Sequence, residues 1–102
     1  MECALTGDPI SAERAQRVGL VNELVDDGEA VGAALALAER IIANSPLAVR
    51  ESRRVLLATS RLGDDESFAI SNQALSVVTR SADFREGLAA FIEKRPPRWT
   101  GR

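Results

Sequence analysis

The stretch from Glu29 to Ala43 limits the folds open to this chain more than any other part of the sequence. Its apolar residues recur at helical spacing and form a stripe of Val31, Leu35, Ala38 and Ile42. After the first turn only Glu39 and Arg40 carry charge, so the predicted helix is apolar around most of its circumference. Such a helix is normally covered on more than one side, which is hard to arrange within a monomer of 102 residues.

Capping residues and helix breakers divide the rest of the chain into four further predicted helices. We expect them at Ser11–Gly19, Pro46–Thr59, Asp65–Arg80 and Ala82–Arg95. Serine and asparagine favour the position before a helix because their side chains accept a hydrogen bond from an early backbone N–H. The candidate caps are Ser11, Asn44 or Ser45, and Ser81. Pro96-Pro97 ends the last helix, since neither residue can donate a helical hydrogen bond.

Other local signals concern loops and side-chain burial. Leu20–Val25 is too short for a helix and is expected to be extended, before a turn at residues 26–28. In the helix that begins at Pro46, we expect burial of Ala48, Val55 and Leu56. Three of the four aromatic residues lie in the last nineteen positions, so the C-terminal end is expected to pack against other residues.

The composition is that of an ordinary soluble domain. Apolar residues make up 45% and charged residues 27%, and the net charge of −2 does not point to nucleic acid or an anionic membrane. No apolar run is long enough for a membrane span, and no signal peptide is recognisable. Cys3 is the only cysteine, which favours a reducing compartment such as the cytoplasm.

Motifs that carry chemistry are absent from these residues. There is no histidine, no cluster of metal-ligating residues and no glycine loop of the kind that binds phosphate. Most of the fifteen acidic residues lie in first turns or near arginines, where capping or solvation is their default role. The residues alone therefore predict a soluble helical domain with no catalytic residue, no metal and no cofactor.

Two stretches nevertheless carry a pattern more specific than their composition. The first is Ala4-Leu5-Thr6-Gly7-Asp8-Pro9-Ile10-Ser11-Ala12-Glu13-Arg14-Ala15, continued by Val18-Gly19-Leu20-Val21-Asn22. The second is Asp83-Phe84-Arg85-Glu86-Gly87-Leu88-Ala89-Ala90-Phe91-Ile92-Glu93-Lys94-Arg95-Pro96-Pro97-Arg98-Trp99-Thr100-Gly101. Between them lie Ala38-Glu39-Arg40-Ile41 and Asn44-Ser45-Pro46-Leu47-Ala48-Val49. Together, in this order, they resemble the C-terminal part of the enoyl-CoA hydratase/isomerase (crotonase) family.

The resemblance implies a mainly α fold for residues 1–102, namely the C-terminal helical region of the crotonase α/β spiral fold without its spiral core. In that family the core supplies the acidic catalytic residues and two backbone N–H groups that stabilise a developing enolate. Those motifs precede the matching region, so Met1 is expected to be an internal methionine that begins a fragment or a truncated reading frame. The implied role is in a trimer or hexamer that acts on acyl-CoA thioesters, with no nucleic acid or membrane as partner.

Phe91 and Lys94 are the two residues to which the resemblance assigns a ligand. The matching positions of the family approach the adenine and a phosphate of coenzyme A bound to a neighbouring subunit. Lys94 would offer a positive charge to phosphate, and Phe91 an apolar or stacking surface. Their alternative roles are a solvated cation near a helix C-terminus for Lys94 and core packing for Phe91.

Several alternatives stay open at this level. Arg50, Arg53 and Arg54 form either an anion-binding face or a solvated face interrupted by Glu51. Asp83 is interpreted as a first-turn acid that complements its helix dipole. Beside the enzyme region, the sequence also allows a stand-alone helical module that binds a protein partner. Nucleic-acid binding through the arginines is disfavoured, because no aromatic platform lies beside them.

Overall fold

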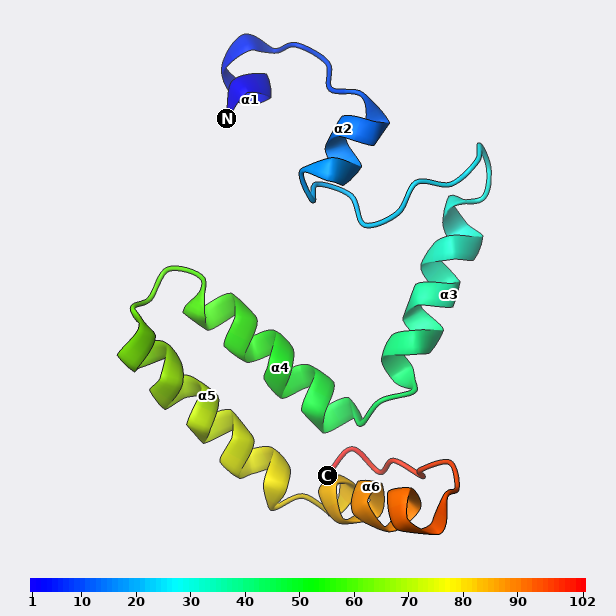
Figure 1. Cartoon of the computed structure of the whole chain (residues 1–102), viewed down its shortest axis with the longest axis vertical. Helices are drawn as coiled ribbons and strands as arrows, with labels where there is room; N and C mark the ends of the chain where they lie inside the picture. Colours follow the sequence, from blue (N-terminus) through cyan, green and yellow to red (C-terminus); the bar gives the residue numbers. More distant parts are fainter. The chain divides into compact units, whose positions relative to one another are not determined.

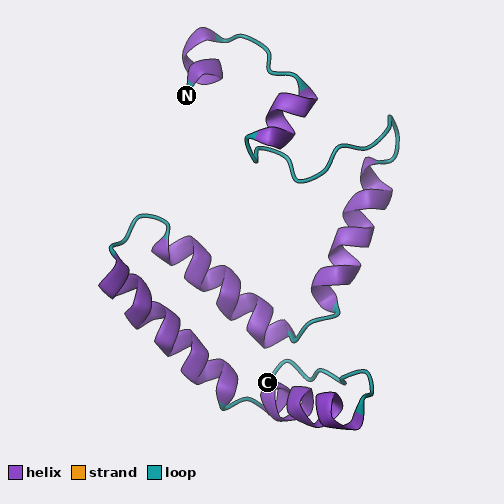
Figure 2. Cartoon of the chain, in the orientation of Figure 1, coloured by secondary structure: helices purple, strands orange, loops and turns teal.

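The computed structural model describes residues 1–102 and contains helices and loops only (Figure 2). Six helices follow one another along the chain (Figure 1): α1 Glu2–Thr6, α2 Ala12–Arg17, α3 Ala30–Ile42, α4 Pro46–Thr59, α5 Asp64–Thr79 and α6 Ala82–Glu93. The predicted mainly α fold is therefore confirmed. The chain divides into two compact units, Met1–Ala38 and Glu39–Arg102.

In the first unit, α2 forms where the capping pattern predicts it. The Ser11 hydroxyl accepts a hydrogen bond from the backbone N–H of Arg14. The chain leaves the helix through Gly19, whose positive φ of 75° suits a residue without a side chain. The short helix α1 was not predicted. It ends at Gly7, which also has a positive φ, and Glu2 at its start forms an ion pair with Arg14 at 2.7 Å.

The segment between α2 and α3 corrects one expectation and confirms another. Leu20–Val25 is irregular and forms no strand, because no neighbouring strand pairs with its backbone. A turn follows, closed by a hydrogen bond from the N–H of Glu29 to the carbonyl of Asp26. Helix α3 then begins one residue later and ends one residue earlier than predicted.

In the second unit, α4 and α5 run antiparallel and pack along their length (Figure 1). Ser45 caps α4 through the N–H of Ala48, and Pro46 occupies the first turn, as predicted. Helix α5 begins at Asp64 after Gly63, one residue earlier than expected. Ala74 is its only buried residue, so small side chains let the two helices approach.

An open apolar groove of about 420 Å³ runs along this helix pair. It is lined by Ala48, Glu51, Ser52, Val55, Leu56, Ser71, Ala74, Leu75 and Val78. The expectation that Leu56 is buried is wrong for the chain by itself, since Leu56 is 71% exposed. Ala48 and Val55 are half-buried. The helical pattern correctly placed Leu56 on the apolar face, but this chain contains nothing that covers that face.

Helix α6 and the residues after it form the best-packed part of the second unit. Ser81 caps α6 by accepting a hydrogen bond from the N–H of Phe84 at 3.0 Å, as predicted. Ala90 and Asp83 are the buried residues of this helix. Beyond Glu93 the chain reverses and returns alongside α6 (Figure 1). The expected packing of the C-terminal end is therefore confirmed.

Candidate functional site: the end of helix α6 and the C-terminal tail

Phe91 lies in the last turn of α6, and Lys94 directly follows the helix. Phe91 is 84% exposed, the highest exposure among the aromatic residues, so core packing within this chain is not its role. The Lys94 side chain is also exposed and forms no ion pair. The structure thus leaves an aromatic surface and a free ammonium group near the same helix end. Lys94 is the only lysine of the chain.

The backbone of Lys94 has a conformation that side chains other than glycine rarely adopt. Its φ of 52° and ψ of 42° make it the only non-glycine residue with a positive φ. Two hydrogen bonds close the helix end: the N–H of Lys94 donates to the carbonyl of Phe91, and the N–H of Arg95 to that of Ala90 at 3.0 Å. This is the Schellman arrangement, in which glycine is usual. The predicted helix end at Arg95 is therefore two residues too late.

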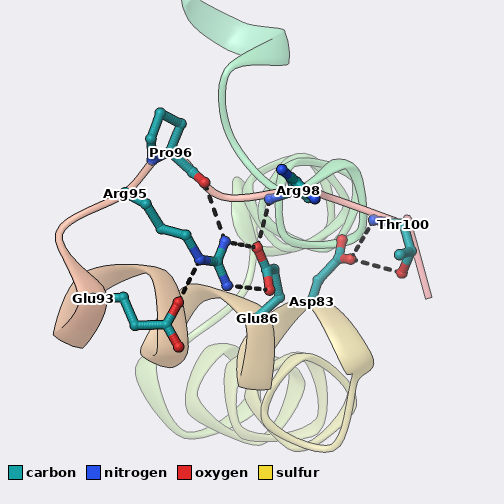
Figure 3. Close-up of polar contacts among 7 residues, drawn as sticks. All are labelled: Asp83, Glu86, Glu93, Arg95, Pro96, Arg98 and Thr100. Carbon is teal, nitrogen blue, oxygen red and sulfur yellow. Dashed lines mark hydrogen bonds and ion pairs between the residues drawn. The ribbon is translucent and has the colours of Figure 1, made fainter.

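An ion-pair cluster stabilises the chain reversal that follows (Figure 3). The Arg95 guanidinium donates two hydrogen bonds to the carboxylate of Glu86, at 2.6 and 3.0 Å, and a third to Glu93 at 2.6 Å. Glu86 also accepts a hydrogen bond from the backbone N–H of Arg98 at 2.7 Å. One glutamate on α6 thus holds both the residue after the left-handed turn and the start of the tail.

These contacts fix the charge of the cluster. The hydrogen bonds from Arg95 and from the Arg98 backbone lower the pKa of Glu86 to about 2, against a weaker opposing effect of burial. Reciprocally, Glu86 and then Glu93 raise the pKa of Arg95 above its ordinary value. Both carboxylates pair with Arg95, and neither forms an ion pair with Lys94.

Asp83 holds the far end of the tail (Figure 3). Its carboxylate accepts hydrogen bonds from the N–H of Thr100 at 2.7 Å and from the hydroxyl of Thr100 at 2.9 Å. It also accepts one from the N–H of Gly101 at 3.1 Å. The hydroxyl of Ser45 donates a further bond at 2.7 Å. Burial opposes the ionisation of Asp83, but these donors outweigh it and lower its pKa. We call Asp83, Glu86, Arg95 and the tail Arg98–Arg102 the tail clamp.

The tail clamp changes the interpretation of Asp83. The residue does occupy the first turn of α6, but it is only 1% exposed and its hydrogen bonds go to Ser45 and the tail. The interpretation as a simple dipole-complementing acid is therefore incomplete. Sequence reasoning missed this role because the partners lie 17 and 38 residues away. The only sign of this role in the sequence was the Asp-x-x-Glu spacing, which places Asp83 and Glu86 on one helix face.

Trp99 joins the tail to both α6 and the start of α4. Its indole N–H donates to the carbonyl of Ala43 at 2.8 Å. The ring lies over Gly87 so closely that a Cβ at that position would meet it at 3.3 Å. Gly87 therefore allows the close approach of the Trp99 ring.

The three arginines of α4 do not form a single free cationic face. Arg54 pairs with Glu51 at 2.8 Å, and Arg50 donates to the carbonyl of Gly101 at 3.1 Å. Only Arg53 has neither an ion pair nor a side-chain hydrogen bond. This arrangement favours the interpretation of a face interrupted by Glu51.

No group of His, Cys, Asp and Glu side chains is placed to hold a metal ion. None of the helices combines the length and apolar character needed to cross a bilayer.

Comparison with known proteins defines the class to which this arrangement belongs. The sequence profile of the enoyl-CoA hydratase/isomerase family matches residues 1–102. The chain therefore belongs to the enoyl-CoA hydratase/isomerase family, and its helices correspond to the C-terminal helical region of that fold. The resemblance on which the sequence interpretation rests is confirmed.

Individual relatives agree with this assignment. The chain is 42% identical over 98 residues to the enoyl-CoA hydratase EchA19 of Mycobacterium tuberculosis, covering 96% of this chain and 37% of that protein. It is 35% identical over 105 residues to a carnitinyl-CoA dehydratase of Salmonella agona, covering 99% of this chain and 40% of the relative. The chain thus spans about two fifths of the length of these relatives.

Solved structures show the same fold. An enoyl-CoA hydratase from Mycobacterium tuberculosis superposes with a TM-score of 0.94 at 49% identity, covering 100% of this chain and 40% of that one. The enoyl-CoA hydratase EchA1 from Mycobacterium marinum superposes with a TM-score of 0.94 at 50% identity, with the same coverage. Identity at this level shows the family as well as the fold.

Proposed function

We propose that this chain is the C-terminal region of an enzyme acting on acyl-CoA thioesters, and that it contributes oligomer contacts and part of the coenzyme A site. The names of the relatives, which include hydratases and a dehydratase of CoA esters, support the substrate class. They favour an enzyme region over a stand-alone interaction module. Which acyl group is transformed depends on residues outside those described, because one scaffold of this kind can carry many reactions.

The exposed end of α6 is the observation that supports the coenzyme A role most directly. A phenylalanine that is 84% exposed and an unpaired lysine lie three residues apart, and neither contributes to the packing of the chain. An aromatic ring can stack on adenine, and an ammonium group can bind phosphate as a point charge. In this proposal Phe91 and Lys94 contact coenzyme A held in an oligomer.

The oligomer role is supported by the apolar surface that the chain leaves uncovered. Side chains such as Leu56, Phe68, Leu75 and Ile92 are each at least 60% exposed. Leu56 and Leu75 line the same groove, which runs along α4 and α5. Contiguous exposed apolar surface marks interaction sites in soluble proteins, and this groove is one such surface.

Titration of the chain with coenzyme A tests the proposal. Lys94→Gln removes one charge-assisted contact worth about 1.5–3 kcal/mol, so the dissociation constant should rise about tenfold or more. The matched control is Arg53→Gln, which removes a positive charge from another exposed helix position and should leave the affinity unchanged. Isothermal titration calorimetry measures both. Equal affinities for wild type and Lys94→Gln would rule out the assigned site.

A further inference from the structure

The backbone conformation of Lys94 indicates which residues orient the two proposed ligand-binding side chains. A left-handed backbone costs an L-residue about 1–2 kcal/mol relative to a right-handed one, and glycine would avoid that cost. Strained residues persist where the surroundings hold them, and they concentrate at functional sites. Here the strained residue is also the only lysine and has no internal ion pair.

Besides the backbone hydrogen bonds that close the helix, one side chain bridges the chain reversal that follows Lys94. After Lys94 the chain must reverse so that Trp99, Thr100 and Gly101 can lie against Gly87 and Asp83. Glu86 binds Arg95 on one side of the reversal and the backbone of Arg98 on the other (Figure 3). The Glu86 carboxylate therefore spans the turn, which starts at Lys94.

The two cations that follow one another at this helix end differ in their partners. Arg95 is paired with Glu86 and Glu93, whereas Lys94 forms no ion pair. The helix end therefore carries one positive charge without a carboxylate partner in this chain.

We propose that Glu86 is a positioning residue for the coenzyme site. By clamping Arg95 and Arg98 it holds Lys94 in the left-handed conformation that presents its ammonium group, together with Phe91, to a phosphate-bearing ligand. This inference rests on the proposed function for the nature of the ligand. The positioning itself is a property of the chain and can be measured without any ligand.

The decisive comparison is Glu86→Gln against Glu93→Gln. Both variants remove one negative charge next to Arg95, and simple electrostatics predicts that each tightens the binding of an anion. Only Glu86→Gln breaks the link across the turn. We therefore expect Glu93→Gln to bind coenzyme A at least as tightly as wild type, and Glu86→Gln to bind it about threefold or more weakly as the competent conformer becomes a minority.

A spectroscopic readout separates this inference from the proposed function. With lysine labelled in ¹³C and ¹⁵N, the chain gives one lysine backbone signal, whose Cα and Cβ shifts report the sign of φ. We expect a left-handed signature in wild type and Glu93→Gln, and its loss in Glu86→Gln. Arg95→Gln, which breaks the same link from the other side, should also lose it if Glu86→Gln does not fold.

The outcomes divide clearly. A left-handed Lys94 in both Glu86→Gln and Arg95→Gln would overturn the positioning role, whatever the ligand affinity. Signatures that change as expected, with no binding of coenzyme A to the wild type, would instead overturn the proposed function and leave the positioning intact.

Lys94→Gly should raise the urea midpoint, because glycine tolerates this backbone, yet weaken coenzyme A binding. A Lys94→Gly variant that binds as wild type would count against the proposal.

Discussion

Asp83 and Glu86 lie one turn apart on α6 and both face the tail, yet they organise it differently. Asp83 is almost completely buried and accepts hydrogen bonds from backbone and hydroxyl groups. Glu86 is partly exposed and accepts from a guanidinium as well as from the backbone. The pKa of each is held below its ordinary value, so both stay ionised through the neutral range.

The depressed pKa of Glu86 predicts an acid-dependent release of the tail. Its pKa is about 2 in the folded chain and 4.5 when free, so the contribution of this group to stability is complete above about pH 4.5. It is lost as the pH falls towards 2. Trp99, the only tryptophan, reports the change, and its fluorescence should shift between pH 4.5 and 2. Glu86→Gln should lack most of this transition, and an identical acid transition in that variant would contradict the assignment.

At the scale of elements, hydrogen bonds tie α6 to the start of α4 and to the C-terminal tail. Its start is held by Ser81 and, through Asp83, by the hydroxyl that also caps α4. The carbonyl of Arg102, the last residue, accepts a hydrogen bond from the N–H of Asp83 at 3.1 Å. The tail therefore supplies part of the N-terminal capping that the first turn of α6 needs.

Gly87 provides a test of how tightly the tail packs on α6. In an exposed helix interior, replacement of glycine by alanine should stabilise by about 1 kcal/mol. At Gly87 the new Cβ would stand 3.3 Å from the Trp99 ring, whose position is fixed by its bond to Ala43. We expect Gly87→Ala to give no gain or a loss in urea unfolding. In a Trp99→Ala background the same substitution should recover the gain, and additive effects in this double-mutant cycle would contradict the packing.

The whole molecule buries little apolar surface of its own. Its buried hydrophobic residues are Ala15, Ala74 and Ala90, all small, whereas large side chains remain open to solvent on every long helix. Helix α3, which the sequence singles out as apolar around its circumference, has no buried residue at all. Such a distribution supports the proposal that other surfaces cover these side chains.

Self-association of the chain should follow from this surface. Each large apolar side chain that becomes buried contributes about 1.5–3 kcal/mol, so a few contacts offset much of the cost of association. Sedimentation equilibrium should give a mass above the 11.0 kDa of one chain, falling on dilution. Leu56→Asn with Leu75→Asn, both in the α4–α5 groove, should shift the chain towards monomer, unlike Glu66→Gln. A monomer at all concentrations would contradict the interpretation of an interaction surface.

The sequence by itself determined five of the six helices, α2 to α6, and the family. Capping by Ser11, Ser45 and Ser81 and the apolar spacing along each helix depend on residues three or four positions apart, so they are legible in the order of amino acids. Only the tertiary structure decided the tail clamp and the conformation of Lys94. Asp83 and Trp99 bind partners 38 and 56 residues away, and no local pattern encodes which distant groups the folded chain brings together.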